Sequence, residues 1–405
     1  MVDTIYRNLR QPDGTFVDLS IADGRIVAME PTGRAESGRA QVVDGNGQLL
    51  LPALVESHVH IDKTLWGLPW RPHSGGPSLK DLIANERRVL REVNVPIAGR
   101  AGALLETCVA QGSLHIRSHI DVDPEIGLRH VEALLALREA YRDVVEMQFV
   151  VFPQMGMLIR PGTAELMERA LEMGVETVGG LDPAGIDNDP IRHLETIFDL
   201  AGKHGRGVDI HLHDGGELGI WQIERIADFT QAGGLAGKVM ISHAFCLGMV
   251  PTTRIEALGR RLADLRISLM TTAPSDISLP PVAFLKALGV NICCGSDGIR
   301  DAWSPYGNGD MLERAMLLSQ RFDWRKDEEL ASAFDSATIA GARALGLTGY
   351  GLAPGHAANF ILLPAENLSD AIARRPQQRT VVGRGMVIAR DGHFLEPRQG
   401  AAGAD

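Results

Sequence analysis

The sequence has few of the features that mark secreted, membrane-spanning or nucleic-acid-binding proteins. It contains four cysteines in 405 residues, Cys108, Cys246, Cys293 and Cys294, and their spacing is typical of neither a disulfide framework nor a zinc ribbon. No apolar run reaches the roughly 18 residues that a transmembrane helix needs, and the first residues lack the pattern of a signal peptide. The formal net charge of −11 disfavours nucleic acids and anionic membranes as partners. We therefore expect a cytoplasmic protein that binds a small molecule, with homo-oligomerisation possible.

Apolar residues make up 45% of the chain, which is enough to fill one large core. Apolar segments alternate with amphipathic sequences of helix length, as βα units require. The segments lie near residues 52–60, 114–120, 147–153, 176–181, 208–213, 238–243, 266–271 and 290–296. Eight such units predict an α/β fold with a (β/α)8 TIM-like barrel, whose functional groups lie at the C-terminal ends of the strands.

Both ends of the chain carry shorter strand-like segments. The stretch "TFVDLSIADGRIVAM" alternates with a period near two around Asp23-Gly24, a dipeptide that favours a tight hairpin turn. Residues 357–365 and 379–394 show the same alternation. We therefore predict a small β-sandwich domain built from residues 1–51 and 356–405, and a barrel domain over residues 52–355.

Histidines and carboxylates gather where the predicted barrel strands end. His58 and His60 end the first strand, and residues two apart in a strand share a face, so both imidazoles should point to one spot. The others follow the fifth, sixth and eighth strands: His211, His213 and Asp214, then His243, then Asp297. One such histidine alone would more often be a hydrogen-bonded core residue. Their coincidence at several strand ends favours a metal site suited to zinc or iron.

The strand motifs resemble the amidohydrolase superfamily, and within it the bacterial cytosine deaminase group, over nearly the whole chain. The resemblance is carried by "LPALVESHVH", "HIRSHIDVD", "QFVVFPQMG", "VDIHLHD", "SHAF" and "NICCGSDGIRDAWSPYGNGDM". It implies that His58, His60, His211 and Asp297 hold one divalent metal ion, and that His243 lies beside the metal-bound water or the substrate. No lysine stands at the fourth-strand ligand position in "TVGGLDP", so a carbamate-bridged pair of metals is not expected.

The resemblance and the chemistry of these groups predict a hydrolytic deaminase. A metal-bound hydroxide would attack the ring carbon that carries an amino group and release ammonia. Asp297 would take a proton from the water, and His243 would stabilise the developing oxyanion. The expected substrate is a cytosine-like amino-heterocycle, that is, an aminopyrimidine, an aminotriazine or a pterin. The alternative is a cyclic-amide or amide hydrolase that uses the same mononuclear metal site to attack a carbonyl.

The proton shuttle is open between two carboxylates. The family usually has a glutamate three residues after the fifth-strand histidine, and here that position is Asp214. Either Asp214 or Glu217 would carry the proton to the leaving nitrogen, although Asp214 could instead cap the following helix. The fifth-strand ligand is open as well. His213 shares a face with His211, and it either replaces His211 as ligand or contacts the substrate.

The third strand and the loop after the eighth strand predict the substrate contacts. Phe152 offers a packing or stacking surface, and the Gln154 amide can pair with a ring N–H and its carbonyl. Trp303 occupies a position where the family places an aromatic side chain over the ring. For each of these, core packing is the alternative role. Gly298 follows Asp297 where the cytosine enzymes often carry a second acid, which leaves more room or changes the polarity.

Two other groups of residues each have two possible roles. His115, His119 and Asp121 in "HIRSHIDVD" either form a structural cluster with Arg117 or contact the substrate. Lys63, just after the first strand, either shapes the mouth of the site or forms a surface salt bridge.

Overall fold

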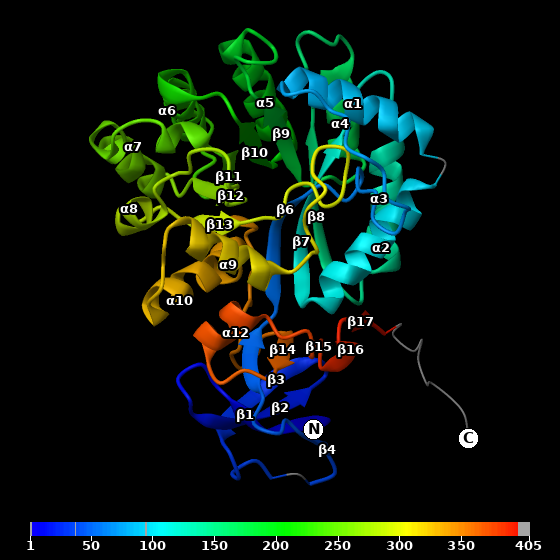
Figure 1. The fold of residues 1–405 in the computed structure, drawn as a ribbon, viewed down its shortest axis with the longest axis vertical. Helices are drawn as coiled ribbons and strands as arrows, with labels where there is room; N and C mark the ends of the chain where they lie inside the picture. Colours follow the sequence, from blue (N-terminus) through cyan, green and yellow to red (C-terminus); the bar gives the residue numbers. More distant parts are fainter. Residues whose placement is uncertain (1, 37, 94, 396–405) are drawn as a thin grey trace.

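The computed structural model describes residues 2–36, 38–93 and 95–395, and the strands in this part of the chain form two sheets (Figure 1). One sheet holds eight strands in sequence order: β6 (Leu54–Val59), β7 (Ser113–Asp121), β8 (Glu146–Phe152), β9 (Thr177–Leu181), β10 (Gly207–Leu212), β11 (Val239–His243), β12 (Ser268–Thr271) and β13 (Ile292–Cys294). Each strand pairs in parallel with the next. The predicted α/β fold with an eight-stranded barrel is confirmed.

The barrel closes where the first strand meets the segment after the last one. The Asp297 N–H donates to the His58 carbonyl at 2.8 Å, and the His60 N–H donates to the Asp297 carbonyl at 3.3 Å. A Cβ at Gly295 would lie 2.6 Å from the His58 Cβ, so only glycine allows this close approach. The buried Glu56 carboxylate accepts the N–H groups of His58 and Ser296. The closure therefore fixes His58, His60 and Asp297 relative to one another.

Helices surround the barrel: α1 (Leu79–Glu92), α2 (Ile97–Ala110), α3 (Arg129–Ala140), α4 (Thr163–Glu172), α5 (Pro190–His204), α6 (Gly216–Ala232), α7 (Thr252–Asp264), α8 (Val282–Ala287), α9 (Met311–Arg321), α10 (Asp327–Ser336), α11 (Ile339–Ala344) and, beside the second sheet, α12 (Leu368–Arg374). A short 3₁₀ helix, η1 (Phe245–Gly248), follows β11. Within the described ranges, we find no helix with the length and apolarity to span a membrane.

Helix α5 shows how the local sequence specifies these helices. The Asp189 side chain accepts the Arg192 N–H at 3.2 Å and caps the N-terminus, and Pro190 occupies the first turn. Gly205 ends the helix with a φ of 64°. The apolar residues that α5 buries follow the helical repeat: Leu194, Ile197, Phe198, Leu200 and Ala201.

The second sheet joins both ends of the chain. It contains β1 (Thr4–Arg10), β2 (Phe16–Ala22), β3 (Arg25–Pro31), β4 (Gln41–Asp44), β5 (Leu49–Pro52), β14 (Phe360–Leu363), β15 (Thr380–Gly383), β16 (Met386–Arg390) and β17 (His393–Phe394). The antiparallel pair β5–β14 connects the two ends, and the expected turn at Asp23-Gly24 links β2 to β3. Residues 1, 37, 94 and 396–405 of the two predicted domains lie outside the described residues, and the domain boundaries stay a prediction.

Strand β5 ties this sheet to the barrel. Leu49 and Leu51 pack into the large core that fills and surrounds the barrel, whereas Leu50 packs into a separate core on the other face of the sheet. This alternation is the period of two that a strand imposes. In Figure 1 the sheet lies below the barrel. Because β5 leads directly into β6, the sheet adjoins the N-terminal end of the first barrel strand and leaves its C-terminal end for the site.

Candidate active site

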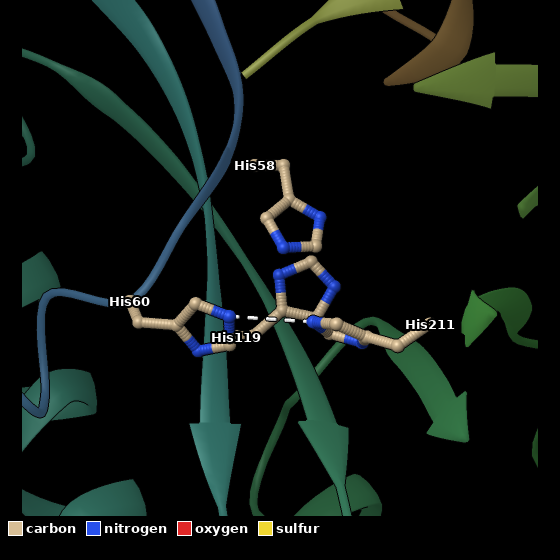
Figure 2. A group of neighbouring side chains, drawn as sticks. All are labelled: His58, His60, His119 and His211. Atoms are coloured by element: carbon tan, nitrogen blue, oxygen red, sulfur yellow. Dashed lines mark hydrogen bonds between the residues drawn. The ribbon is translucent and has the colours of Figure 1, made fainter. Parts of the chain in front are cut away.

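Four histidines from three barrel strands meet at the C-terminal ends of the strands (Figure 2). We call His58, His60, His119 and His211 the histidine cluster. The ring centres of His58 and His119 lie 3.9 Å apart, and those of His58 and His211 lie 4.6 Å apart. The Nε2 atoms of His60 and His211 are 3.3 Å apart, as marked by the dashed line in Figure 2. One nitrogen from each ring can be chosen so that all four lie within 4.8 Å of one another, which is close enough to hold one ion.

A second group of four side chains, one of them a carboxylate, is also close enough together to hold one ion. It consists of His58, His211, His243 and Asp297. Asp297 Oδ1 lies 3.6 Å from His58 Nε2 and 3.2 Å from His60 Nε2, and its Oδ2 lies 4.0 Å from His243 Nε2. The structure therefore brings together the four predicted ligands and His243.

The buried histidines are suited to binding a cation because they are neutral. Burial lowers the pKa of His58 to about 3, and it lowers the pKa values of the other rings well below their usual value: His119, His211 and His243. A neutral imidazole offers a lone pair to a metal. Although burial opposes it, the neighbouring His58 and His60 rings hold the pKa of Asp297 well below its usual range, so this group is a carboxylate.

Several of these nitrogen atoms have no protein partner. In the described chain, buried ring nitrogens that make no hydrogen bond include His58 Nε2, His60 Nδ1, His211 Nδ1 and both nitrogens of His119 and His243. Leaving so many buried polar atoms unpaired is costly unless something else binds them. Neutral imidazoles beside a carboxylate are the donor set of zinc and non-haem iron sites, so the residues fit a divalent metal ion.

A hydrogen-bond chain beneath the cluster orients His58. Its Nδ1 lies 3.0 Å from Ser242 Oγ, and the Ser242 hydroxyl donates to Asp209 Oδ1 at 2.8 Å. Asp209 Oδ2 lies 3.5 Å from both Arg117 Nη1 and His119 Nε2. Partners of this kind set the tautomer and the direction of a ligating imidazole. Asp209 was not predicted from the sequence, although its spacing of two from His211 places both on one face of β10.

Two residues of the site have unusual backbone conformations. His243 has a φ of 70° and Asp297 a φ of 62°, in the left-handed region that non-glycine residues seldom adopt. His243 ends β11, and Asp297 lies three residues after the end of β13. Such conformations cost free energy and are concentrated at functional sites, where the surrounding structure imposes them.

A cavity of about 700 Å³ lies against the cluster, and His60, His211, His243 and Asp297 line it. The four residues predicted to contact the substrate also line it: Phe152, Gln154, Trp303 and His213. A concave site of this size accommodates a small organic molecule. The cavity therefore places the predicted ligands and the predicted substrate contacts in one space.

One side of this cavity is a polar wall made of Lys63, Glu86 and Gln154, each at most 3% exposed. Lys63 Nζ donates to Gln154 Oε1, and Gln154 Nε2 donates to Glu86 Oε1 at 2.6 Å. Lys63 Nζ also lies 3.4 Å from Glu86 Oε1. Burial raises the pKa of Glu86 to about 7, although Lys63 opposes the shift. Lys63 is thus not a surface residue, and Glu86 was not identified from the sequence.

The predicted aromatic contacts line the cavity in different ways. Phe152 is 1% exposed and stacks on the His211 ring, with centres 4.8 Å apart and planes 16° apart. Lys63 Nζ lies 4.9 Å from the centre of the Phe152 ring. Trp303 is half-buried, and its indole Nε1 has no hydrogen-bond partner among the described residues. Phe152 therefore packs against His211, a predicted ligand, whereas the Trp303 indole N–H is a free hydrogen-bond donor.

His213, just after β10, lies in the cavity but outside both groups of possible metal ligands. His213 lines it, and its Nδ1 lies 2.8 Å from Asp182 Oδ2. His213 belongs to neither group of possible metal ligands, whereas His211 belongs to both.

Neither shuttle candidate is among the residues that line the cavity. Asp214 Oδ2 accepts the Gly185 N–H at 3.0 Å and the Gln222 amide at 2.9 Å. Glu217 has a side chain 64% exposed and pairs with Arg254 at 3.0 Å. Asp214 does not cap α6 either, because Gly215 occupies that position without a side-chain bond. The shuttle assignment stays a prediction.

The second-strand residues separate along β7. His115, near the start of the strand, lies 3.2 Å from Glu146 and far along the strand from the cluster. His119 joins the histidine cluster, a role that sequence analysis did not give it. Asp121 accepts the Gln154 backbone N–H at 3.2 Å and so helps to position the polar wall.

Comparisons with known proteins agree with this geometry. Residues 41–391 match the model of the amidohydrolase family. The N-isopropylammelide isopropyl amidohydrolase of Pseudomonas sp. (strain ADP) is 31% identical, over 96% of this chain and 98% of that protein. The structure of N-isopropylammelide isopropylaminohydrolase from Burkholderia multivorans ATCC 17616 is 40% identical, with a TM-score of 0.94 over 98% of this chain and 100% of that one.

A second similar structure belongs to an enzyme named for a different substrate. The 5-methylcytosine deaminase of Klebsiella pneumoniae, liganded with 5-fluorocytosine, is 28% identical, with a TM-score of 0.83 over 98% of this chain and 100% of that one. The predicted resemblance to the superfamily and its cytosine-deaminase-like members is thereby confirmed. With a family match over most of its length and a His-rich site at the ends of its barrel strands, this chain belongs to the amidohydrolase family.

Proposed function

We propose that this protein is a metal-dependent hydrolytic deaminase that releases an amine from a ring carbon of a cytosine-like amino-heterocycle. The class includes aminopyrimidines, aminotriazines and pterins, and we place aminotriazines first. The observation that carries the proposal is the histidine cluster with its unpartnered nitrogens, which opens into a cavity walled by an amide, a lysine and aromatic rings. The names of relatives at 31% and 40% identity, both N-isopropylammelide hydrolases, support the preference for triazines.

His58, His60, His211 and Asp297 would hold one divalent ion, zinc or iron, which when bound lowers the pKa of water and supplies the nucleophile. His119 lies in the same cluster and is a further nitrogen donor for the ion. Ser242 and Asp209 hold His58 in the orientation that leaves its Nε2 free. These residues are thus arranged before the substrate binds, which is what efficient electrostatic catalysis requires.

Asp297 and His243 act on the attacking water and on the charge that develops. The Asp297 side chain is 38% exposed and lines the cavity, so its carboxylate can accept a proton from water. His243 is neutral and lies 4.0 Å from Asp297 Oδ2, where an N–H of its ring can stabilise negative charge on the substrate.

The second proton transfer, to the leaving nitrogen, is proposed for Asp214 or Glu217. Either carboxylate would have to leave its present partners to reach the cavity, Gly185 and Gln222 for Asp214 and Arg254 for Glu217. Asp214 is the better placed, because it adjoins His213, which already lines the cavity. If Asp214 is the shuttle, Asp214→Asn lowers kcat by roughly 10²- to 10⁴-fold.

The polar wall is suited to a ring that carries an oxo group. The Lys63 ammonium has three N–H donors, of which Gln154 accepts one, and it forms an ion pair with Glu86. A further donor is available to a ring carbonyl. The cavity of about 700 Å³ exceeds the needs of a bare six-membered ring, which leaves space for an alkyl group on the departing amine.

The test pairs metal analysis with a screen for amine release. The purified protein is analysed for its metal content, reloaded with zinc or iron, and incubated with cytosine, 5-methylcytosine, isocytosine, ammelide, N-isopropylammelide and pterin. We expect about one metal ion per chain and release of ammonia or alkylamine from at least one oxo-bearing ring. A fully loaded protein that releases no amine from any of them would contradict the proposal. Ring opening without amine release would point to the amide hydrolase instead.

A further inference from the structure

Asp301 occupies the space where residue 298 would carry a side chain. A Cβ added to Gly298 would overlap Asp301 Oδ2 and would lie 2.8 Å from Asp301 Cγ. Both residues line the cavity directly after Asp297. From the sequence, Gly298 was expected to leave more room beside Asp297 or to change the polarity there. The structure instead fills that room with a carboxyl group from three residues further on.

A tight turn holds this carboxyl group in place. Asp301 Oδ1 accepts the backbone N–H groups of Trp303 and Ser304, both at 2.8 Å. The Asp301 N–H donates to the Ser304 carbonyl at 3.0 Å, which closes the turn from the backbone side. This is the arrangement in which aspartate or asparagine side chains stabilise a turn. The turn engages one carboxyl oxygen and leaves Oδ2 for the cavity.

The second oxygen of Asp301 lacks a protein donor. Among residues 2–36, 38–93 and 95–395, no group donates a hydrogen bond to Oδ2, and no lysine, arginine or histidine pairs with this carboxylate within 4.0 Å. The residue is nevertheless only 3% exposed. Burial raises the pKa of Asp301, and the neighbouring Asp297 carboxylate raises it further. An acceptor that lines the cavity without a protein donor gains a hydrogen bond from a donor that a ligand brings.

We propose that Asp301 Oδ2 accepts a hydrogen bond from an N–H of the heterocycle and so positions the ring beside Asp297. The inference rests on the proposed function and specifies its substrate class. Lys63 on the polar wall offers a donor, and Asp301 offers an acceptor in the same cavity. The preferred ring therefore presents both a carbonyl oxygen and a ring or amino N–H. Rings whose nitrogens are alkylated on the side facing Asp301 are poor substrates.

The first test is Asp301→Asn in the metal-loaded protein. Asparagine keeps the oxygen that the turn uses, so we expect an unchanged Tm, but it replaces Oδ2 with an amide that cannot accept. For the best substrate of the screen, kcat/KM should fall about 10- to 100-fold, the size of one hydrogen bond to a charged group. Substrates methylated at one ring nitrogen at a time should include one that the wild type handles poorly and for which Asp301→Asn makes no further difference.

Gly298→Ala tests the same contact from the other side. The added methyl group cannot coexist with the present position of the Asp301 carboxyl, so it should displace Oδ2 and reproduce the loss. The double variant should be no worse than either single variant, because both remove one interaction. Asp189→Asn is the matched control. Asp189 also accepts a backbone N–H, but it caps α5 and does not line the cavity, so kcat/KM should not change.

Calorimetric binding of cyanuric acid, an oxo-bearing ring with N–H groups, separates the two proposals. If the wild type releases no amine from any ring, the proposed function fails, and binding of cyanuric acid still reports on Asp301. We expect the Kd to rise about 10-fold or more in Asp301→Asn. If the wild type turns over a substrate while Asp301→Asn has the wild-type kcat/KM and Kd, Asp301 serves the turn alone and the inference is overturned.

Discussion

The histidine cluster and the polar wall are both buried in one cavity, yet they differ in how their polar atoms are satisfied. The cluster leaves several ring nitrogens without a partner. In the polar wall, Lys63, Gln154 and Glu86 bond to one another. Unpaired buried lone pairs are tolerated where a cation binds, whereas a paired network is rigid before any ligand arrives. The comparison therefore assigns metal binding to the cluster and substrate orientation to the wall.

The largest effect is expected from replacing a histidine that belongs to both groups of possible metal ligands. His58→Gln should lose most of the bound metal and lower kcat/KM by roughly 10³-fold or more, because several kcal/mol of stabilisation disappear with the ion. Elemental analysis and amine release measure the two effects. Ser242→Ala is the graded comparison. It removes the partner of His58 Nδ1, together with one hydrogen bond to Asp209, but no ligand, and it should cost about 10- to 100-fold in metal affinity. Full metal content and activity in His58→Gln would refute the assignment.

Breaking the polar wall should affect stability more than metal binding. Lys63→Met leaves the Glu86 carboxylate buried without its cation and should lower the free energy of unfolding by about 3–5 kcal/mol at pH 8. The cost should be smaller at pH 6, where Glu86 can take up a proton. The double variant Lys63→Met/Glu86→Gln should recover much of the loss. Urea unfolding of the metal-loaded proteins measures these free energies. If the losses of the two single variants simply add in the double variant, the pairing of Lys63 with Glu86 is contradicted.

A smaller effect concerns the pH dependence of stability. Glu86 has a pKa of about 7 in the folded protein against 4.5 for an ordinary glutamate, and burial is the main cause. Its neighbours Asp301, Asp121 and Asp62 raise the pKa further, whereas Lys63 lowers it. The folded state thus holds a proton that the unfolded state releases. The stabilisation is complete below about pH 4.5 and is lost as the pH rises through about 7.

Glu86→Gln isolates this contribution from those of other buried acids. The difference in unfolding free energy between the wild type and the variant should change between pH 4.5 and pH 7 and be constant outside that window. Urea unfolding over a pH series gives the curve. A constant difference across the window would mean that Glu86 titrates like an exposed glutamate.

The sequence predicted the barrel and most of the cluster because both follow from strand periodicity. His58 and His60 are two residues apart at a strand end, and Asp297 follows the last strand. Glu86 could not be found this way. It lies on α1, after a loop of 60–78 that has no regular spacing, and its burial depends on the distant partners Lys63 and Gln154.

The position of the proton shuttle could not be predicted from the sequence for a different reason. Placing the shuttle carboxylate three residues after His211 assumes one particular conformation of the loop after β10. Here Asp182 accepts the backbone N–H of Asp214 at 3.0 Å, and Gly185 donates to its side chain. These contacts come from the loop after β9, which the spacing around His211 does not describe. They turn Asp214 away from the cavity.

The smallest effect is expected for Glu217→Gln. The Glu217 carboxylate is at the surface and pairs with Arg254, which also contacts Glu224 at 3.1 Å. A pair of this kind contributes at most about 1 kcal/mol, so stability should barely change. Because the carboxylate does not line the cavity, kcat should stay within about twofold of the wild type. A loss of kcat beyond about tenfold with an unchanged Tm would identify Glu217 as the shuttle. It would also mean that α6 moves toward the cluster when substrate binds.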